Sequence, residues 1–364
     1  ESTSNFSFFY CRDYGAEGDT SDDLPDLDPP IEVTSYVGSG FIEELIFKVS
    51  DASDAIGVRV LRNPGYLTPY AWYVDQGFTG SPSSSSVDGY AAVTDGNTTY
   101  VTATNVKSGT IYSNLYAVSY TEGAESTSEE IFSQILDNWS FNANDAVVTD
   151  VNLCQSTADS SYATDSSGDF LSCDWDGDCL DTCELVADTT STYACSLTGE
   201  TCDVDADCAQ MTCDAEKAKV SRDLSRLQDM VVIAGQLDDY GDENGFCSVT
   251  TNQTCTSDDS CPGEETCEPS VPALADGTYV SSYSVSTWPS WASGLGNALG
   301  TSVPTDPINE FYECDDENYE SDTCWNSIRA TFMCPDESHA YGYRSVGGLS
   351  FELSASLEYD DDVW

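Results

Sequence analysis

Three pairs of cysteines in this chain share one spacing, with acidic residues between the two members of each pair. The members lie six positions apart and enclose DWDGD, DVDAD and TSDDS: Cys173 and Cys179, Cys202 and Cys208, Cys255 and Cys261. Outer cysteines flank the last two pairs: Cys195 and Cys213, Cys247 and Cys267. Units this small cannot bury a hydrophobic core and must be held by covalent bridges. The spacing therefore predicts repeated, disulfide-stapled loops, with their connectivity left open.

All cysteines of the chain are predicted to form disulfides. Their number is even, and most are concentrated between Cys154 and Cys267, which indicates an oxidising compartment. Zinc is the alternative, but the chain has one histidine and lacks the CxxC spacing that zinc sites usually bring. The 16 residues are Cys11, Cys154, Cys173, Cys179, Cys183, Cys195, Cys202, Cys208, Cys213, Cys247, Cys255, Cys261, Cys267, Cys314, Cys324 and Cys334.

The charge of the chain is extreme. Asp and Glu number 65 and Lys and Arg number 11, so 65 − 11 = 54 negative charges are left in excess. Such a surface repels itself unless concentrated salt screens it, with a Debye length of about 3 Å at 1 M, or divalent cations neutralise it. We therefore expect a salty exterior. Nucleic acid and anionic membranes are excluded as electrostatic partners, because their binding requires clustered Lys and Arg.

Calcium is the metal that the acidic clusters favour. Carboxylates alternate across a glycine turn in the first six-residue loop, as at the start of an EF-hand. The predicted ligands are Asp174, Asp176, Asp178 and Asp181, with a second cluster at Asp203, Asp205 and Asp207. The alternative is a solvated acidic loop, since such clusters arise readily in a chain with 65 acidic residues.

Other features agree with an extracellular location. Four Asn-x-Ser/Thr sequons are candidate glycosylation sites: Asn5, Asn97, Asn138 and Asn252. No stretch approaches the roughly 20 apolar residues of a membrane span. Because the chain begins with Glu-Ser-Thr-Ser, we expect that a leader was removed or that the segment was cut from a longer protein.

The first third of the chain predicts an arm followed by one domain. Residues 1–30 read as an arm or linker, in which alternating Phe6 and Phe8 predict a short strand that pairs within its own domain. Residues 31–142 predict strands at 56–62, 87–106 and 110–120, a short helix through Tyr70, and an amphipathic helix capped by Ser126 or Thr127. This order, with VDGYAAV and EEIFSQILDNWSF, resembles the PsbP-like fold of small secreted binding domains.

The remainder predicts a cysteine-rich region at 143–213 and a domain at 214–364 that is interrupted by a second stapled loop at 247–267. The strongest helix runs over 214–240, with its apolar stripe at Val220, Leu224, Leu227, Val231, Ala234 and Leu237. A terminal hairpin is expected around Gly347-Gly348. A long helix, a PTDP segment and a terminal hairpin resemble the globular part of type IV pilins and of the type II secretion pseudopilin. The motifs YAWYVDQGF, DGYAAV, CWNSIRA and TWPSW resemble uncharacterised surface proteins of Patescibacteria.

Catalytic chemistry has weak support in the sequence. His339 at the start of a predicted strand is more commonly structural than a general base. Trp288 and Trp291 could stack on sugar rings beside a carboxylate pair, but core packing is the simpler interpretation. We therefore predict that the chain is not an enzyme.

A cluster of basic residues opens the long helix, at Lys217, Lys219, Arg222 and Arg226. One hypothesis is that this cluster contacts an acidic face of another subunit. The alternative is local pairing with Glu216, Asp223 and Asp229.

These observations predict an α+β, multi-domain protein with antiparallel sheets, packed helices and disulfide-stapled irregular loops. The leading functional hypothesis is an extracellular, non-enzymatic structural subunit of a surface filament or cell coat, which forms homo-oligomers and for which calcium is the candidate cofactor. An adhesin that binds a glycan or a neighbouring cell is the second hypothesis, and a secreted hydrolase is the third.

Overall fold

A computed structural model shows two compact units, residues 1–151 and 152–364, and each is described by itself. The structure describes residues 6–7, 31–36, 40–49, 53–107, 110–141, 152–157, 162–168, 170–173, 175–186, 193–250, 253–272, 274, 282–312, 314, 318–321, 323–329, 331–333 and 338–359. Its helices, antiparallel sheets and stapled loops confirm the predicted α+β, multi-domain class.

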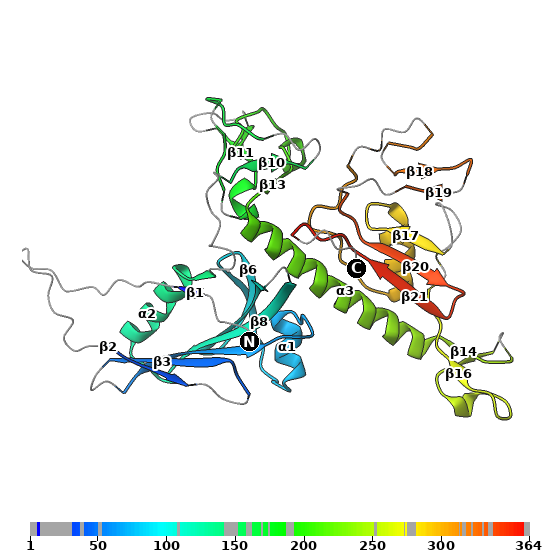
Figure 1. Cartoon of the computed structure of the whole chain (residues 1–364), viewed down its shortest axis with the longest axis horizontal. Coiled ribbons are helices and arrows are strands. Elements are labelled where there is room, and N and C mark those ends of the chain that lie inside the picture. Colours follow the sequence, from blue (N-terminus) through cyan, green and yellow to red (C-terminus); the bar gives the residue numbers. More distant parts are fainter. Residues whose placement is uncertain are drawn as a thin grey trace, which may run out of the picture. The chain divides into compact units, whose positions relative to one another are not determined.

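The first unit is built on a seven-stranded antiparallel sheet in the order β2-β3-β4-β8-β7-β6-β5 (Figure 1). Neighbours in sequence pair as hairpins, except that β4 pairs with β8. The strands are β2 (Ile31–Tyr36), β3 (Glu43–Val49), β4 (Ala55–Arg62), β5 (Ser83–Val87), β6 (Tyr90–Asp95), β7 (Thr98–Lys107) and β8 (Thr110–Tyr120). The strands predicted at 56–62, 87–106 and 110–120 are confirmed, whereas β2 and β3 were not predicted.

Helices cover both faces of this sheet. Successive side chains of a strand point to opposite faces, so Leu115 and Tyr116 in the middle of β8 are both fully buried. Helix α1 (Pro69–Asp75) packs on one face, where the ring of Trp72 lies 5.6 Å from that of Tyr100 in β7. Helix α2 (Ser126–Asp137) packs on the other face through Phe132. The sheet is therefore the middle layer of this unit.

The start of α2 differs from the prediction. Neither Ser126 nor Thr127 caps the helix; the residue at the N-cap is Glu125, whose side chain makes no capping bond. Asp54, which precedes β4, instead accepts hydrogen bonds from the Glu125 amide and the Ser128 hydroxyl, both at 2.9 Å. The cap comes from a residue about 70 positions earlier, which no local pattern could reveal.

A short antiparallel pair joins the arm to this unit. Strand β1 (Phe6–Ser7) pairs with β9 (Ser140–Phe141), with Phe6 opposite Phe141. This confirms that Phe6 pairs within its own unit, while Phe8 lies outside the described residues.

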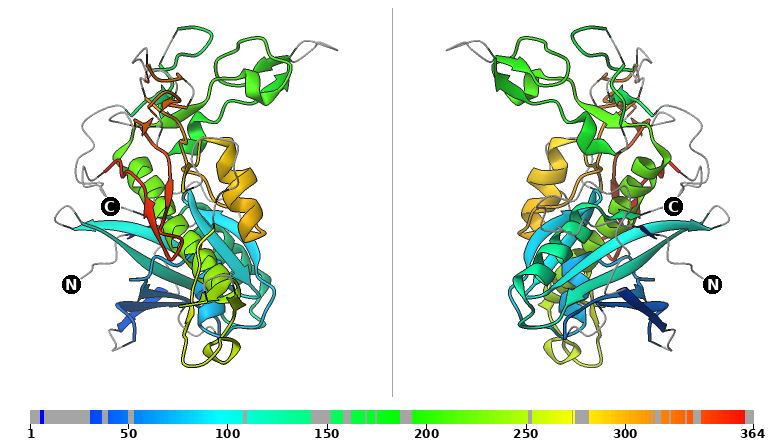
Figure 2. Two further views of the ribbon diagram at one scale, coloured as in Figure 1. Left: turned by 90° about the vertical axis from the view of Figure 1, so that its right-hand side faces the viewer. Right: turned by 90° about the vertical axis from the view of Figure 1, so that its left-hand side faces the viewer.

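The second unit is organised around the long helix α3 (Glu216–Glu243). A sheet in the order β17-β20-β21 follows it, and β21 packs against α3 (Figures 1 and 2). The elements of this part are β17 (Tyr283–Val285), the π-helical turn η5 (Trp291–Gly296), α4 (Asn297–Leu299), β18 (Trp325–Asn326), β19 (Thr331–Phe332), β20 (Gly342–Val346) and β21 (Ser350–Ser354). Gly347 and Gly348 form the hairpin turn with φ of 63° and 77°, a conformation that glycine adopts without a steric cost.

The core of this unit lies between α3, the sheet and η5. Its buried residues are Ile233, Leu237, Leu274, Trp291, Leu295, Val303, Tyr341, Tyr343 and Ala355. The predicted helix stripe is right at Val220, Leu224, Leu227 and Leu237 but wrong at Val231, which is exposed. Met230 and Ile233 pack in the core in its place, because the residues of α3 that face the hairpin differ slightly from the predicted stripe.

No helix within the described residues is both long and apolar enough to cross a membrane.

Candidate functional site: three cysteine repeats and a buried ion network

Four cysteines recur in the same order three times in the second unit. We define repeat 1 as Cys154, Cys173, Cys179 and Cys183, repeat 2 as Cys195, Cys202, Cys208 and Cys213, and repeat 3 as Cys247, Cys255, Cys261 and Cys267. They carry short strands: β10 (Cys154–Ser156), β11 (Cys183–Leu185), β12 (Tyr193–Cys195), β13 (Met211–Cys213), β14 (Gly245–Cys247), β15 (Thr254–Cys255) and β16 (Cys267–Glu268). The first cysteine of each repeat lies on a strand, and so does the fourth.

The six-residue spacing between the second and third cysteines forms a 3₁₀ turn in every repeat. These turns are η2 (Asp176–Cys179), η3 (Asp205–Asp207) and η4 (Asp258–Ser260). Each begins with an aspartate whose carboxylate accepts a hydrogen bond from the backbone N–H of a fourth cysteine. The donor–acceptor distances are 2.9 Å from Cys213 to Asp176, 2.9 Å from Cys183 to Asp205 and 2.8 Å from Cys267 to Asp258.

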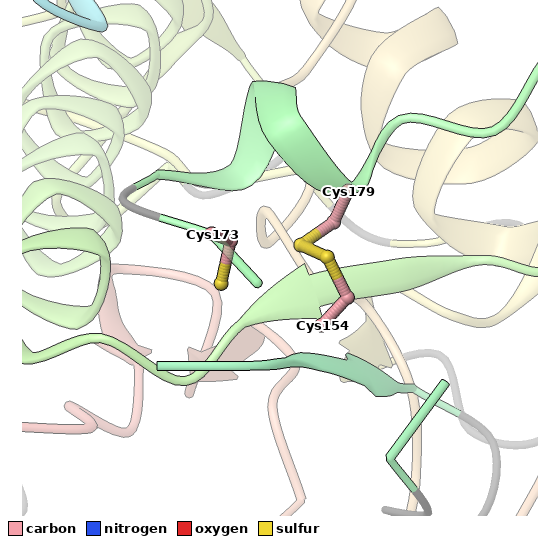
Figure 3. A group of neighbouring side chains, drawn as sticks. All are labelled: Cys154, Cys173 and Cys179. Atoms are coloured by element: carbon pink, nitrogen blue, oxygen red, sulfur yellow. A yellow bond between two sulfur atoms is a disulfide. The ribbon is translucent and has the colours of Figure 1, made fainter. Parts of the chain in front are cut away.

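The first and third cysteines of each repeat are bridged to one another. These disulfides are Cys154–Cys179, Cys195–Cys208 and Cys247–Cys261, with Cα–Cα distances of 5.4, 5.6 and 5.5 Å. Figure 3 shows the first of them, with Cys173 beside it. The shared bridge, the 3₁₀ turn and the hydrogen bond to its aspartate together give the three repeats one local arrangement.

The second and fourth cysteines are bridged within repeat 3 but exchanged between repeats 1 and 2. Repeat 3 contains Cys255–Cys267, whereas the other two bridges are Cys173–Cys213 and Cys183–Cys202. The strands that carry first and fourth cysteines pair in the same pattern. Cys154 lies opposite Cys213, Cys195 lies opposite Cys183, and Cys247 lies opposite Cys267. Repeats 1 and 2 thus swap their fourth-cysteine strands.

The cysteine spacing left the connectivity open, and the structure shows that Cys195 and Cys213, the outer cysteines of one loop, are bridged differently. Cys195 bonds within that loop, but Cys213 reaches the preceding repeat. With Cys314–Cys324, fourteen cysteines lie in seven bridges, which confirms disulfide bonding for them. Cys11 and Cys334 lie outside the described residues.

The predicted calcium ligands act here as hydrogen-bond acceptors for backbone amides. Asp181 accepts from the amides of Leu197 and Thr198, and Asp207 accepts from that of Asp203. Asp174 lies outside the described residues. Within those residues, the groups whose potential metal ligands lie within 4.8 Å of one another are three cysteine triplets, and these cysteines are all in disulfides. The described aspartates of the two clusters therefore do not form such a group, and calcium stays a prediction.

An ion network joins repeat 1 to α3 and to the C-terminal segment. Arg226 is fully buried; its guanidinium donates to Asp306 at 2.8 and 3.0 Å, to Asp223 at 2.7 Å and to Glu358 at 2.6 Å. Arg222, also buried, forms ion pairs with Glu358 and with Asp176 of the repeat 1 turn. The two arginines therefore hold three segments that are distant in sequence against one helix.

The carboxylates of this network respond differently to their surroundings. Burial alone would raise the pKa of Glu358, but the hydrogen bond from Arg222 and the charge of Arg226 outweigh it and lower the pKa to about 2. Burial raises the pKa of Asp176, and Arg222 offsets this only in part. Nearby, burial raises the pKa of Asp229 to about 6, although the Tyr341 hydroxyl donates to it at 2.8 Å.

The hypothesis that the basic cluster contacts another subunit is not supported by this geometry at its two arginines. Both side chains are buried and bound to carboxylates of their own chain, because the turn of repeat 1 and the segments around Asp306 and Glu358 cover that part of α3.

The alternative, local pairing along the helix, is confirmed for two of the three acidic residues. Asp223 forms an ion pair with Arg226, and Glu216 forms one with Lys219. Asp229 instead bonds Tyr341. Lys217 is half-buried on the same helix. Asp306 and Glu358 were missed, since nothing local marks either one.

The remaining candidate residues have structural surroundings. Trp288 and Trp291 are buried in the core, and their indole N–H groups donate to the carbonyls of Thr323 and Pro304. His339 pairs through its backbone with Glu310, and burial, with the charge of Arg226, lowers the pKa of its imidazole.

The sequons are only partly described. The side-chain amides of Asn97 and Asn138 donate to the carbonyls of Tyr120 and Gln134. Asn5 and Asn252 lie outside the described residues.

Comparison of the chain with protein-family models, with curated proteins and with solved structures gave no match.

The exchanged bridges can be read directly by peptide mapping of the unreduced protein. We expect peptides that link Cys173 to Cys213 and Cys183 to Cys202, because each of these fourth cysteines lies on a strand that pairs with the first-cysteine strand of the other repeat. Links of Cys173 to Cys183 and of Cys202 to Cys213 would contradict the exchange. Repeat 3 serves as the internal control, since its Cys255–Cys267 link is expected in either case.

Removing one arginine should test the ion network. Arg226→Met leaves Asp306 and Asp223 buried without their counter-charge, and breaking a buried pair in this way costs about 3–5 kcal/mol. Lys219→Met on the same helix removes only an exposed pair and should cost about 0.5 kcal/mol or less. Urea unfolding followed by tryptophan fluorescence measures both, and equal losses would contradict the network.

The lowered pKa of Glu358 predicts an acid sensitivity with a defined sign. Because the pKa is lower in the folded than in the unfolded chain, the stabilisation is present above the ordinary value of 4.5 and is lost as pH falls through about 2. The stability difference between the wild type and Glu358→Gln should therefore shrink by about 3 kcal/mol between pH 6 and pH 2. Urea midpoints across that range measure the difference, and a constant difference would refute the assignment.

Proposed function

We propose that this chain is an extracellular structural subunit of a surface filament or cell coat. The observation that carries the proposal is the set of six bridges in three repeats, which lie on either side of α3 in the sequence. Repeats 1 and 2 precede this helix and repeat 3 follows it (Figure 1). A helix of 28 residues spans about 42 Å, so it is a rigid spacer between covalently closed ends.

The location follows from the same bridges and from the charge. Disulfides in this number persist outside the reducing cytosol. Copies that each carry 54 excess negative charges repel one another, so ordered assembly requires screening salt or bridging cations such as calcium. The filament part of the proposal draws on the resemblance of residues 214–364 to pilins.

A binding module for a glycan or a neighbouring cell is the second candidate, favoured by apolar side chains exposed on repeats 1 and 2. Leu185 and Tyr193 lie opposite one another in the β11–β12 pair and are about half exposed, and Leu180 and Val204 are more exposed still. Exposed apolar groups of this size commonly mark a binding surface.

Electron microscopy of the protein in about 1 M NaCl with calcium separates the two functions. A structural subunit should form filaments or sheets that lose order when a chelator is added or when salt is lowered. Dispersed monomers under all of these conditions would overturn the proposal. A binding module should instead give saturable glycan binding by the monomer, which the double variant Leu185→Ser, Tyr193→Ser should lose.

A further inference from the structure

Repeat 3 differs from repeats 1 and 2 in the segment between its third and fourth cysteines, and this segment accounts for the exchange. The hinge, defined as the segment between the third and fourth cysteines, has three residues in repeat 1 (180–182), four in repeat 2 (209–212) and five in repeat 3 (262–266). The hinge of repeat 3 contains Pro262 and Gly263, and Gly263 has φ of 70°. The other two hinges contain neither residue type.

These differences determine where the fourth strand can go. In every repeat the fourth-cysteine strand lies antiparallel to the strand of a first cysteine, and in a repeat that closes on itself the chain returns to that strand through the 3₁₀ turn and the hinge. Repeat 3 does so with Pro262-Gly263, which supplies the turn conformation that only glycine adopts readily. Short hinges without such a turn carry the strand onward to a neighbour, which is the general origin of domain swapping.

We propose that hinge length decides which repeat receives a fourth strand, and that a repeat with a short hinge is a docking site for the fourth strand of another repeat, including one from a second copy of this chain. The proposal stands on the repeat geometry and goes beyond the assembly proposed above. Exchange between copies would link two chains covalently through the same contacts that now link repeats 1 and 2.

The contacts that hold a fourth-cysteine strand in its docking site occur both in repeat 3, which keeps its own strand, and between repeats 1 and 2, which exchange theirs. The acceptor supplies the strand edge of its first cysteine and the turn aspartate that binds the incoming fourth-cysteine amide. The strands of repeats 1 and 3 also supply a carboxylate two positions before the fourth cysteine: Asp181 accepts a hydrogen bond from Thr198 of repeat 2, and Glu265 accepts one from Thr250 of its own repeat. Both threonines lie three positions after a first cysteine. The strand pairing and the turn-aspartate contact are therefore the same whichever repeat donates, and the carboxylate contact is common to the strands of repeats 1 and 3, whereas repeat 2 has Met211 at that position.

A second copy is the partner that this chemistry fits, because it carries the donor sequences themselves. Within one chain, eleven residues separate Cys183 from Cys195, so the local concentration of donor and acceptor is high and favours exchange inside the chain. Repeat 3 has no such neighbour, since α3 separates it from repeat 2. An opened repeat 3 can thus be completed only by another chain, and salt is needed to screen the repulsion between the two copies.

The covalent step balances in the ordinary way for disulfides. The thiols of Cys255 and of Cys267 from the second copy lose two electrons and two protons to a small-molecule disulfide such as oxidised glutathione, which becomes two thiols. A thiolate attacks the small disulfide, and the second thiolate then displaces the small thiol from the mixed disulfide.

Two hinge variants of the full chain test the proposal. Deleting Pro262 and Gly263 leaves repeat 3 with a three-residue hinge, as in repeat 1. On non-reducing denaturing gels we expect the reoxidised deletion variant to give a disulfide-linked dimer, with the dimer fraction rising with the protein concentration during reoxidation in high salt. The matched control Pro262→Ser keeps the hinge length and Gly263, and should give no disulfide-linked dimer on the same gels.

The dimer should contain Cys255 of one copy bonded to Cys267 of the other, which mass spectrometry detects after nitrogen-15-labelled and unlabelled chains are reoxidised together. The reverse variant replaces residues 180–182 and 209–212 with Pro-Gly-Glu-Glu-Thr. It should move the bridges to Cys173–Cys183 and Cys202–Cys213. A deletion variant in which Cys255 is free, or paired with any residue other than Cys267 of a second copy, would overturn the proposal. Wild-type pairing in the reverse variant would overturn it as well. These readouts do not depend on whether the wild type forms filaments.

Discussion

A chain with 54 excess negative charges stays folded only if its carboxylates have something to bind. Eleven basic residues cannot neutralise 65 acidic ones. Among the described residues, the two most buried arginines lie in a single network on α3. There, Arg222 and Arg226 bind Asp176, Asp306 and Glu358, so the scarce positive charge is used where it joins distant segments. The fold of the second unit depends on this concentration of charge.

Backbone amides take the place of cations elsewhere in the second unit. A carboxylate that accepts from main-chain N–H groups satisfies a donor that would otherwise be left unpaired. The turn aspartates of the three repeats do this in the same position, and Asp181 and Glu265 add a second contact of the same kind. An alternating acidic loop that resembles a calcium site in sequence is here part of the internal hydrogen bonding.

Disulfides stabilise the repeats, because these segments are too small to bury a hydrophobic core and hydrogen bonds alone would not keep them folded. Each repeat consists of short strands, one 3₁₀ turn and two bridges, and most of its cysteines are buried. Because two of the repeats share their second bridges, repeats 1 and 2 form one cross-linked body. The cysteine-rich region is thus a pair of interdependent repeats within the second unit, although its sequence looks like a string of separate loops.

Local sequence determined much of this protein: the class of fold, most strands of the first sheet, α3, the terminal hairpin and the repeated spacing of the cysteines. These features follow from side-chain periodicity and from turn residues, which act over a few positions. Tertiary structure alone decided that Asp54 caps α2, that Met230 and Ile233 replace Val231 in the buried stripe, and that Glu358 meets Arg222. Each of these depends on segments that meet only after the chain has folded, and the free energy of such a contact has no signature in the residues beside either partner.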